Sequence, residues 1–399
     1  MEKVEKKIKI AIVNDAFYPL IDGVTKVVEN YALELCKLPN VEVVLVAPGP
    51  RKQEDFDKYY KNLPYRVLLC KASKLGFDGY NRSIITKEFR KQFEDEKFDV
   101  VHCHSIFDLY KFVIKMRKKQ GFPVILTVHS QYRPDYKRYV KFPPLVWWWM
   151  KLTKWKLNKC DLLFSINEKM DEYIRKNVGF NGKSRIVSNA THFKPPANLA
   201  SIREGAYKKY GLEKGANVFS FVGRLLVEKG ILIILDALAT LKQRGIPFKM
   251  FYVGHGFDEK KLRAEVERLG LGNEVVLTGQ LSNMSELVEV YAISKLYLFP
   301  SKFDTDGLVK REAAMCGVPS VLLENTFTNA GIVDGVNGYI SQEGNGVYAE
   351  KIIEALSDEK KRQEVAKAAK ETLSLTWTEA VAHACEIYRE ILAKEVFYK

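Results

Sequence analysis

The strongest constraint on the fold is a regular alternation of short apolar runs with helix-like segments along nearly the whole chain. Runs that are apolar throughout are typical of strands buried on both faces of a parallel sheet. In the first half they are Ile8–Val13, Val41–Ala47, Arg66–Cys70, Asp99–Cys103, Val124–Val128, Leu162–Ile166 and Arg185–Val187. In the second half they are Val218–Val222, Lys249–Val253, Glu274–Leu277, Leu296–Phe299, Ser320–Leu323 and Gly338–Ile340. The two series predict an α/β protein with two successive Rossmann-like domains.

A double proline separates the two series. Pro195 and Pro196 block a helix and offer few backbone hydrogen bonds, so the segment Lys194–Asn198 is predicted to be a linker. We therefore expect an N-terminal domain over residues 1–194 and a C-terminal domain over residues 201–373. Residues 374–399 are predicted to form a C-terminal helix that can pack back on the N-terminal domain.

Several classes of protein are excluded by composition. Hydrophobic residues make up 47% of the chain and charged residues 28%, which is too apolar for a disordered chain. No apolar stretch approaches the roughly 18 residues that span a bilayer, and the charged N-terminus does not resemble a signal peptide. The six cysteines lie far apart with no CxxC pair, so we expect reduced thiols in a cytosolic protein, without disulfides or zinc.

The positive charge is unevenly distributed. The net charge is +14, and the segment 111–160 holds 13 Lys and Arg residues with one acid, Asp135. Clustered tryptophans lie in the same segment, at Trp147, Trp148 and Trp149, and Lys151 and Lys154 follow them. Indole rings favour the headgroup zone of a bilayer, and basic residues are attracted to anionic lipid. The segment is therefore predicted to touch an anionic membrane surface.

Two other interpretations of this basic segment remain open. The tryptophans can belong to the core, with the lysines forming a solvated face. Basic charge with aromatic residues can also bind single-stranded nucleic acid, although no signature of a nucleic-acid-binding module is present and we expect no such partner.

Glycine-containing loops follow the first strand of each half. Gly23 precedes the first helix, where it can let a ligand approach the helix N-terminus. In the second half, Arg224 and Lys229 lie in the loop that opens the next helix, where two cations could hold a diphosphate. Gly254, a candidate donor-binding residue, lies in a third loop, but Glu259 breaks the dinucleotide-binding fingerprint there, and the chain contains no P-loop sequence.

A fourth loop brings two carboxylates near a helix start. Asp304 lies on the loop and Glu312 on the helix that follows. Carboxylates accept hydrogen bonds from sugar hydroxyls, and the amides of Leu308 and Val309 at the helix start can point at phosphate. Two solvated acids are the alternative interpretation of this pattern.

Taken together, these motifs resemble the retaining, GT-B-fold glycosyltransferases of family 4, over nearly the whole chain. The most specific elements are the GRL-x-x-EKG-like segment Gly223–Gly230 and the loop that ends at Glu312-Ala313. The family pattern has two glutamates separated by seven residues, and Asp304 replaces the first of them. The resemblance implies the GT-B fold, in which two Rossmann-like domains face each other across a cleft that binds a nucleotide-sugar.

The family pattern also implies roles for individual residues. Arg224 and Lys229 would neutralise the diphosphate of the donor, and Glu312 would bind the ribose. Asp304 would hold hydroxyls of the transferred hexose. His129, which ends a strand, matches the active-site histidine of the family, although a buried structural histidine is the alternative. His102 and His104 are interpreted as structural, and no metal or other cofactor is expected.

The acceptor is indicated by the opening of the chain. The segment Phe17–Thr25 looks like that of bacterial diacylglycerol glucosyltransferases. With the basic tryptophan segment, this resemblance favours hexose transfer from UDP-glucose to diacylglycerol by an enzyme bound peripherally to the cytoplasmic face of the cell membrane. Transfer to a polyprenyl-linked or cell-wall glycan is an alternative within the family, and a non-catalytic sugar-nucleotide-binding protein is an alternative outside it.

Overall fold

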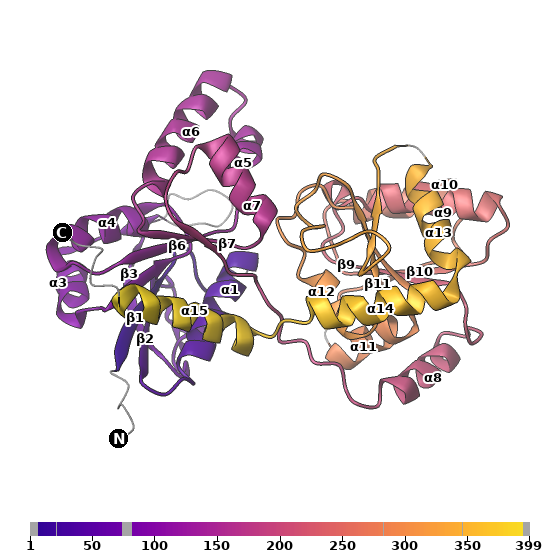
Figure 1. Ribbon diagram of the computed structural model, residues 1–399, viewed down its shortest axis with the longest axis horizontal. Coiled ribbons are helices and arrows are strands. Elements are labelled where there is room, and N and C mark those ends of the chain that lie inside the picture. Colours follow the sequence, from indigo (N-terminus) through magenta and orange to yellow (C-terminus); the bar gives the residue numbers. More distant parts are fainter. Residues whose placement is uncertain (1–6, 21, 74–81, 282, 345, 394–399) are drawn as a thin grey trace. The chain divides into compact units, whose positions relative to one another are not determined.

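The computed structural model describes residues 7–20, 22–73, 82–281, 283–344 and 346–393. The chain divides into two compact units (Figure 1). Unit 1 contains Met1–Asn189 together with Trp377–Lys399, and unit 2 contains Ala190–Thr376. Each unit has its own parallel sheet, as the two series of apolar runs predict.

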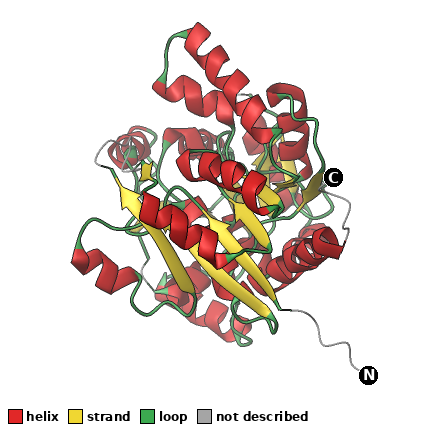
Figure 2. Ribbon diagram, turned by 90° about the vertical axis from the view of Figure 1, so that its left-hand side faces the viewer, coloured by secondary structure: helices red, strands yellow, loops and turns green. Residues whose placement is uncertain are grey.

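The sheet of unit 1 has eight described strands in the order β4-β3-β2-β1-β5-β6-β7-β8. All neighbours are parallel except β3 and β4. In Figure 2 these strands lie among the helices of the unit, which bury the central strands. The strands are β1 (Ile8–Val13), β2 (Val41–Pro48), β3 (Arg66–Ala72), β4 (Ser83–Ile84), β5 (Val100–Cys103), β6 (Val124–Val128), β7 (Leu162–Ser165) and β8 (Ser184–Ile186).

The helices of unit 1 connect these strands, and the last of them comes from the C-terminal end of the chain. One turn has π-helical hydrogen bonding (η1, Ile174–Val178) and directly follows a short α-helix. The helices are α1 (Gly23–Leu35), α2 (Gln53–Tyr59), α3 (Lys87–Glu96), α4 (Asp108–Gln120), α5 (Tyr132–Tyr139), α6 (Pro143–Leu157), α7 (Glu168–Tyr173) and α15 (Trp377–Ala393).

Unit 2 has six described strands, all parallel, in the order β11-β10-β9-β12-β13-β14. They are β9 (Val218–Val222), β10 (Lys249–Val253), β11 (Val275–Gly279), β12 (Leu296–Phe299), β13 (Ser320–Leu323) and β14 (Tyr339–Ser341). The helices are α8 (Leu199–Lys209), η2 (Val227–Lys229, a 3₁₀ turn), α9 (Ile231–Gln243), α10 (Glu259–Arg268), α11 (Met284–Ile293), α12 (Val309–Met315), α13 (Val347–Ser357) and α14 (Glu359–Leu373).

The chain changes unit at points that differ slightly from the predicted boundaries. Unit 2 begins at Ala190, before the double proline, because Phe193 is buried in the core of unit 2 and Thr191 pairs with Thr376. The return to unit 1 follows Thr376. Helix α15 then packs on α1, where the Thr378 hydroxyl donates to Glu34 Oε2 at 3.0 Å.

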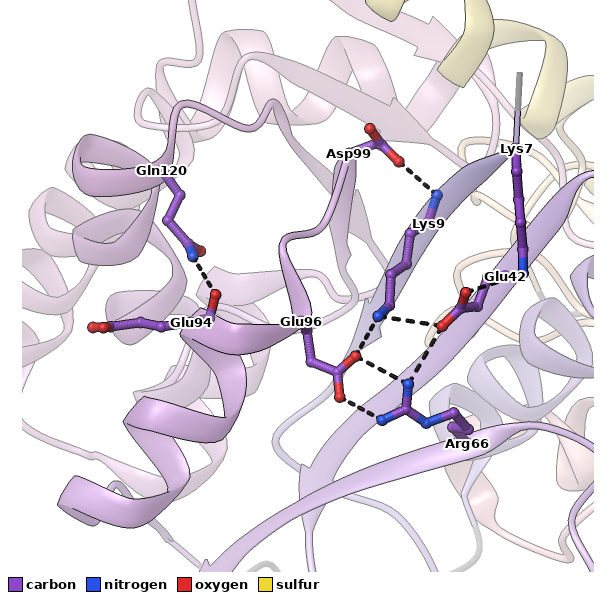
Figure 3. Close-up of polar contacts among 8 residues, drawn as sticks. All are labelled: Lys7, Lys9, Glu42, Arg66, Glu94, Glu96, Asp99 and Gln120. Atoms are coloured by element: carbon purple, nitrogen blue, oxygen red, sulfur yellow. Dashed lines mark hydrogen bonds and ion pairs between the residues drawn. The ribbon is translucent and has the colours of Figure 1, made fainter. Parts of the chain in front are cut away.

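An ion-pair network joins strands of unit 1 at the edge where β1 begins (Figure 3). Lys9 Nζ lies 2.5 Å from Glu96 Oε2 and 3.2 Å from Glu42 Oε1. Arg66 contacts the same two carboxylates, at 2.6 Å and 3.3 Å respectively. Burial lowers the pKa of Lys9, but its hydrogen bonds to Glu96 and Glu42 outweigh burial and raise that pKa. The network ties β1, β2 and β3 to the end of α3 at the edge opposite the carboxyl ends of the strands.

Candidate active site

In each of the two sheets, the strand order reverses direction beside one central strand, β1 in unit 1 and β9 in unit 2. The chain continues from β1 to one side and later returns to the other side at β5, and β9 has the same position between β10 and β12. In open parallel sheets, ligands bind beyond the carboxyl ends of the strands where the order reverses in this way. In unit 2 the loops at this point are 223–230 after β9 and 300–308 after β12, which contain the predicted residues Arg224, Lys229, Asp304 and Leu308.

Glycines allow the loops of unit 2 to pack backbone against backbone. Gly254 has φ 130°, and a Cβ atom there would lie 2.1 Å from the carbonyl oxygen of Gly223. Gly230 has φ 79°, and a Cβ atom there would lie 2.4 Å from the carbonyl oxygen of Pro300. No side chain fits at either position. Gly254, predicted as a donor-binding residue, therefore holds the loops after β9 and β10 together.

Lys229 and Asp304 form an ion pair, although 75 positions separate them in the sequence. Lys229 Nζ donates to Asp304 Oδ1 at 2.8 Å, and the other carboxylate oxygen accepts from the Ser301 hydroxyl at 2.6 Å. Only 11% of the Lys229 side chain and 23% of the Asp304 side chain are exposed. The ammonium therefore has a fixed position at the carboxyl edge of the sheet. Ser301, which the sequence analysis missed, orients the carboxylate.

Arg224 differs from Lys229 in its environment. Its side chain is exposed, and among the described residues it makes no ion pair or side-chain hydrogen bond. The backbone of its loop is nonetheless fixed, because Leu225 N donates to His255 O at 3.0 Å and Val227 N donates to Asp258 Oδ2 at 2.8 Å. A guanidinium on a fixed loop can adjust to an anion without moving the backbone.

Glu312 is a largely buried carboxylate with weak hydrogen bonds. Its two oxygens accept from the Thr191 and Tyr291 hydroxyls, each at a long 3.4 Å. Burial raises the pKa of Glu312 to about 7, and the two hydrogen bonds only partly oppose that shift. A ligand hydroxyl that donates to this carboxylate would stabilise its ionised form.

Helix α12 begins at Val309, and Leu308 is its cap residue. A buried cluster that sequence reasoning missed fixes this helix start. Lys310 Nζ donates to the carbonyl oxygens of Thr328 and Ala330 and lies 3.6 Å from Asp306 Oδ1. The acid and the base both lie inside the segment 304–312, so the loop between the two predicted sugar-binding carboxylates is anchored to the core.

In unit 1, Gly23 is the first residue of α1, and the Asp22 carboxylate caps this helix by accepting from Thr25 N at 2.6 Å. Apart from its chain neighbours and the backbone of its own helix, no atom of the described residues lies within 4 Å of the position that a Cβ of Gly23 would occupy. Unlike Gly254, Gly23 therefore fills no tight backbone contact within the protein. The open space beside it is compatible with a ligand.

His129 lies directly after β6 and pairs with His104, which lies directly after the neighbouring strand β5. His104 Nδ1 and His129 Nε2 share a hydrogen bond of 3.0 Å, and the two rings stack at 5.3 Å between centroids. Burial, with repulsion from His102 and His129, holds the pKa of His104 well below its usual range, so His104 is neutral. His102 is fully buried, and its Nδ1 shares a hydrogen bond of 2.7 Å with the hydroxyl of Tyr388 of α15. His102 lies in β5 and His104 directly follows this strand, and their two-residue spacing, which places both on one face of an extended chain, could have revealed the cluster.

The predicted membrane segment, residues 111–160, includes most of α4 and all of β6, and its later part folds into α5 and α6, which lie side by side in unit 1. Trp147 and Trp148 are 62% and 51% exposed, so they are not core residues. Trp149 points elsewhere, since its ring packs edge-on against Tyr136 of α5 at 5.2 Å. Lys151 and Lys154 are exposed, and the Lys151 ammonium lies 5.1 Å from the centre of the Trp147 ring.

Helix α6 has two apolar faces. Val146, Thr153 and Leu157 are buried against unit 1. A second set at helical spacing is exposed to solvent, and we call it the exposed stripe: Leu145, Trp148, Leu152 and Trp155. Large apolar side chains gathered on one exposed face commonly mark an interaction surface.

Family models match both units. The model "Glycosyltransferase Family 4" matches residues 21–192, and "Glycosyl transferases group 1" matches residues 203–372. Together the two models cover most of the chain, which therefore belongs to the glycosyltransferases that contain a family 4 domain followed by a group 1 domain. The family resemblance seen in the sequence is thereby confirmed.

Two curated relatives of this glycosyltransferase match over most of their length. The alpha-monoglucosyldiacylglycerol synthase of Acholeplasma laidlawii is 26% identical over 345 residues, which cover 83% of this chain and 84% of the relative. The GDP-mannose-dependent alpha-mannosyltransferase of Corynebacterium glutamicum is 25% identical over 410 residues, covering 98% and 91% respectively.

Solved structures confirm the GT-B fold class. Sucrose-phosphate synthase of Thermosynechococcus elongatus matches with a TM-score of 0.74 and 18% identity, over 97% of this chain and 99% of that chain. HepE of Anabaena in complex with UDP-glucose matches with a TM-score of 0.70 and 17% identity, over the same shares.

Two features are absent from the described residues of the glycosyltransferase. No helix there has both the length and the apolar character needed to cross a bilayer. No group of three or more His, Cys, Asp or Glu side chains there is arranged to hold a metal ion.

Proposed function

We propose that this glycosyltransferase moves a hexose from UDP-glucose to diacylglycerol with retention of the anomeric configuration, while bound to the cytoplasmic face of the cell membrane. The observation that carries the transfer chemistry is the Lys229–Asp304 ion pair at the carboxyl edge of the unit 2 sheet. The pair supports the proposal because a cation and a carboxylate lie together at the point where the strand order reverses, which is where ligands bind in open parallel sheets.

In this proposal, the donor binds through four groups of unit 2. Arg224 and Lys229 hold the diphosphate, Asp304 accepts hydrogen bonds from the hexose, and Glu312 accepts from the ribose. Transfer breaks the bond between the anomeric carbon and the diphosphate oxygen, so negative charge grows on the leaving group. The two cations, with the amides of Leu308 and Val309, stabilise that charge.

The remaining assignments lie in unit 1. We assign His129 to the hexose, held by its hydrogen bond to His104, and Gly23 to the approach of the donor phosphates. With two cations assigned to the diphosphate, we expect transfer to need no metal ion, and activity that survives EDTA would support this expectation.

Two observations support a lipid acceptor at a membrane. The first is the exposed stripe of α6, whose tryptophans suit the headgroup zone of a bilayer, with the exposed Lys151 and Lys154 on the same helix. The second is the Acholeplasma relative, whose name refers to a glucosylated diacylglycerol. About 1 kcal/mol for each basic residue near an anionic surface makes peripheral attachment favourable.

The decisive experiment incubates the protein with radiolabelled UDP-glucose and vesicles containing diacylglycerol and anionic phospholipid. A labelled glycolipid should form. Arg224→Ala and Lys229→Ala should each lower the rate on the order of 100-fold to 1000-fold, whereas Lys208→Ala, at an exposed lysine of α8, should leave it unchanged.

Other outcomes would change the proposal. Wild-type rates in both Arg224→Ala and Lys229→Ala would refute the donor site. Label that enters only a polyprenyl-linked or cell-wall glycan would refute the diacylglycerol acceptor. UDP binding without any turnover or donor hydrolysis would favour a non-catalytic sugar-nucleotide-binding protein.

A further inference from the structure

Unit 1 contains a pocket of about 710 Å³ between α5, α6 and the π-helical turn η1. None of its described lining residues belongs to the histidine pair or to the proposed donor-binding residues. We call it the basic pocket. Its lining residues are Arg133, Lys137, Val140, Lys141, Pro143, Val146, Trp147, Met150, Lys151, Lys154, Lys176, Asn177, Val178 and Gly179.

The lining of the basic pocket has one sign of charge. It includes six cations and no carboxylate. Lys176 is paired with Glu172, but the other five make no ion pair with any described carboxylate. A concave surface with cations of one sign and apolar walls concentrates positive potential and attracts anions. The cations that make no ion pair are Arg133, Lys137, Lys141, Lys151 and Lys154.

The rest of the lining is largely apolar. Val140, Pro143, Val146, Met150 and Val178 contribute carbon surface. An inorganic anion would pair with the cations but leave the apolar surface exposed to water. A neutral lipid would cover the apolar surface but leave the cations without an anionic partner. A ligand that has both a phosphate and an attached hydrocarbon uses the whole lining.

Backbone geometry shapes one wall of the basic pocket. The π-helical turn η1 carries Lys176, Asn177 and Val178, and Gly179 ends it with φ 86°. A Cβ atom at Gly179 would lie 3.1 Å from the Lys154 side chain, which packs over this glycine. The turn and α6 therefore approach closely, and Lys154 is held at the pocket.

We propose that the basic pocket binds the phosphate of an anionic glycerophospholipid, with the glycerol and the first part of an acyl chain against its apolar wall. Trp147 lies in the pocket, and its neighbour Trp148 belongs to the exposed stripe, so a lipid held here would lie beside the stripe. This proposal goes beyond diffuse attraction to a membrane, because it assigns one lipid to a defined site in each chain. It does not depend on sugar transfer.

The test uses the full-length protein and dihexanoyl phosphatidylglycerol below its micelle-forming concentration, with calorimetry and tryptophan fluorescence as readouts. We expect saturable binding of one lipid per chain. Arg133→Gln combined with Lys137→Gln should weaken binding about 30-fold, which corresponds to about 2 kcal/mol. The control combines Lys91→Gln with Lys118→Gln, which removes the same charge from exposed positions of α3 and α4, and should change affinity by less than about twofold.

Three results would overturn the proposal. Equal losses in the two double variants would show diffuse attraction rather than a site. Equal binding of dihexanoyl phosphatidylcholine would show that the net negative charge is not recognised. Inorganic phosphate that binds as tightly as the short-chain lipid would refute the lipid as occupant. The binding test contains no sugar donor, so its result does not depend on transfer. A chain that binds the lipid in this test but forms no glycolipid in the separate transfer assay would support this site and refute the proposed transfer.

Discussion

At the scale of single residues, Glu312 couples burial to ligand binding. Its pKa is raised from 4.5 to about 7 by burial, so near neutral pH the ionised form costs stability. Stability from the protonated form is fully present below pH 4.5 and is lost as the pH rises through about 7. If ribose hydroxyls donate to the ionised carboxylate, the bound donor offsets that cost.

Glu312→Gln should therefore separate stability from donor affinity. At pH 8 the variant should melt at a higher temperature than the wild type without ligand, and at pH 4.5 the difference should shrink. Wild-type affinity for UDP-glucose should rise between pH 6 and pH 8, and Glu312→Gln should bind more weakly with little pH dependence. UDP-glucose is suitable because its diphosphate does not titrate in this range. A variant with the wild-type pH profile would show that Glu312 does not contact the donor.

Gly23 gives a second prediction at the residue scale. Since no atom of the described residues outside its own helix and its chain neighbours would lie within 4 Å of an added Cβ, Gly23→Ala should stabilise α1 by about 0.5–1 kcal/mol. The added methyl group should nevertheless lower kcat/KM at least about tenfold, because it would occupy space that we assign to the donor phosphates. Gly205→Ala in α8 is the matched control, since it also has open space, and it should gain stability without losing activity. If Gly23→Ala kept full activity, the first loop would have no role at the donor.

At the scale of elements, the ion-pair network at the start of β1 predicts an effect on stability alone. Glu96→Gln leaves Lys9 and Arg66 with fewer partners and should lower the free energy of unfolding by about 1–2 kcal/mol, measured by urea titration. Glu94→Gln on the same helix breaks one surface pair, with Lys119, and should cost less than about 0.5 kcal/mol. Both should keep wild-type kcat, because the network lies at the edge opposite the proposed site. A loss of kcat in Glu96→Gln would contradict that separation.

Every described strand except the two-residue β4 was predictable from the sequence, but α5 and α6 were not. A buried parallel strand is apolar throughout, so each apolar run matched a strand closely. Helix α6 has apolar residues on a buried face and an exposed face, so it lacks the contrast that reveals a helix. Its two prolines lie in the first turn, where a helix tolerates them, although in a sequence a double proline is usually taken as a sign that no helix is present.

The candidate site was predictable in part. The loops could be located because each follows a strand in the sequence. The Lys229–Asp304 pair and the contacts of Glu312 with Thr191 and Tyr291 could not, because they depend on how strands far apart in the chain are ordered in the sheet. The structure shows where these side chains lie, and their roles in transfer stay predictions.

At the scale of the whole molecule, the chain runs from unit 1 to unit 2 and returns through α15. The proposed donor-binding cations and carboxylates all belong to unit 2, and the basic pocket and the exposed stripe belong to unit 1. UDP-glucose and the membrane should therefore protect different backbone segments from hydrogen exchange. UDP-glucose should slow hydrogen exchange in loops 223–230 and 300–308, whereas vesicles containing phosphatidylglycerol should slow it in α5 and α6.

Variants can test whether the protection by UDP-glucose and the protection by vesicles are independent. Lys229→Ala should lose the protection by UDP-glucose and keep the protection by vesicles. Trp148→Ser combined with Trp155→Ser should do the reverse, because it removes apolar area from the exposed stripe and leaves unit 2 intact. Hydrogen–deuterium exchange read by mass spectrometry resolves both segments in one experiment. If either variant lost both patterns of protection in a folded chain, donor and membrane binding would not be separate properties of the two units.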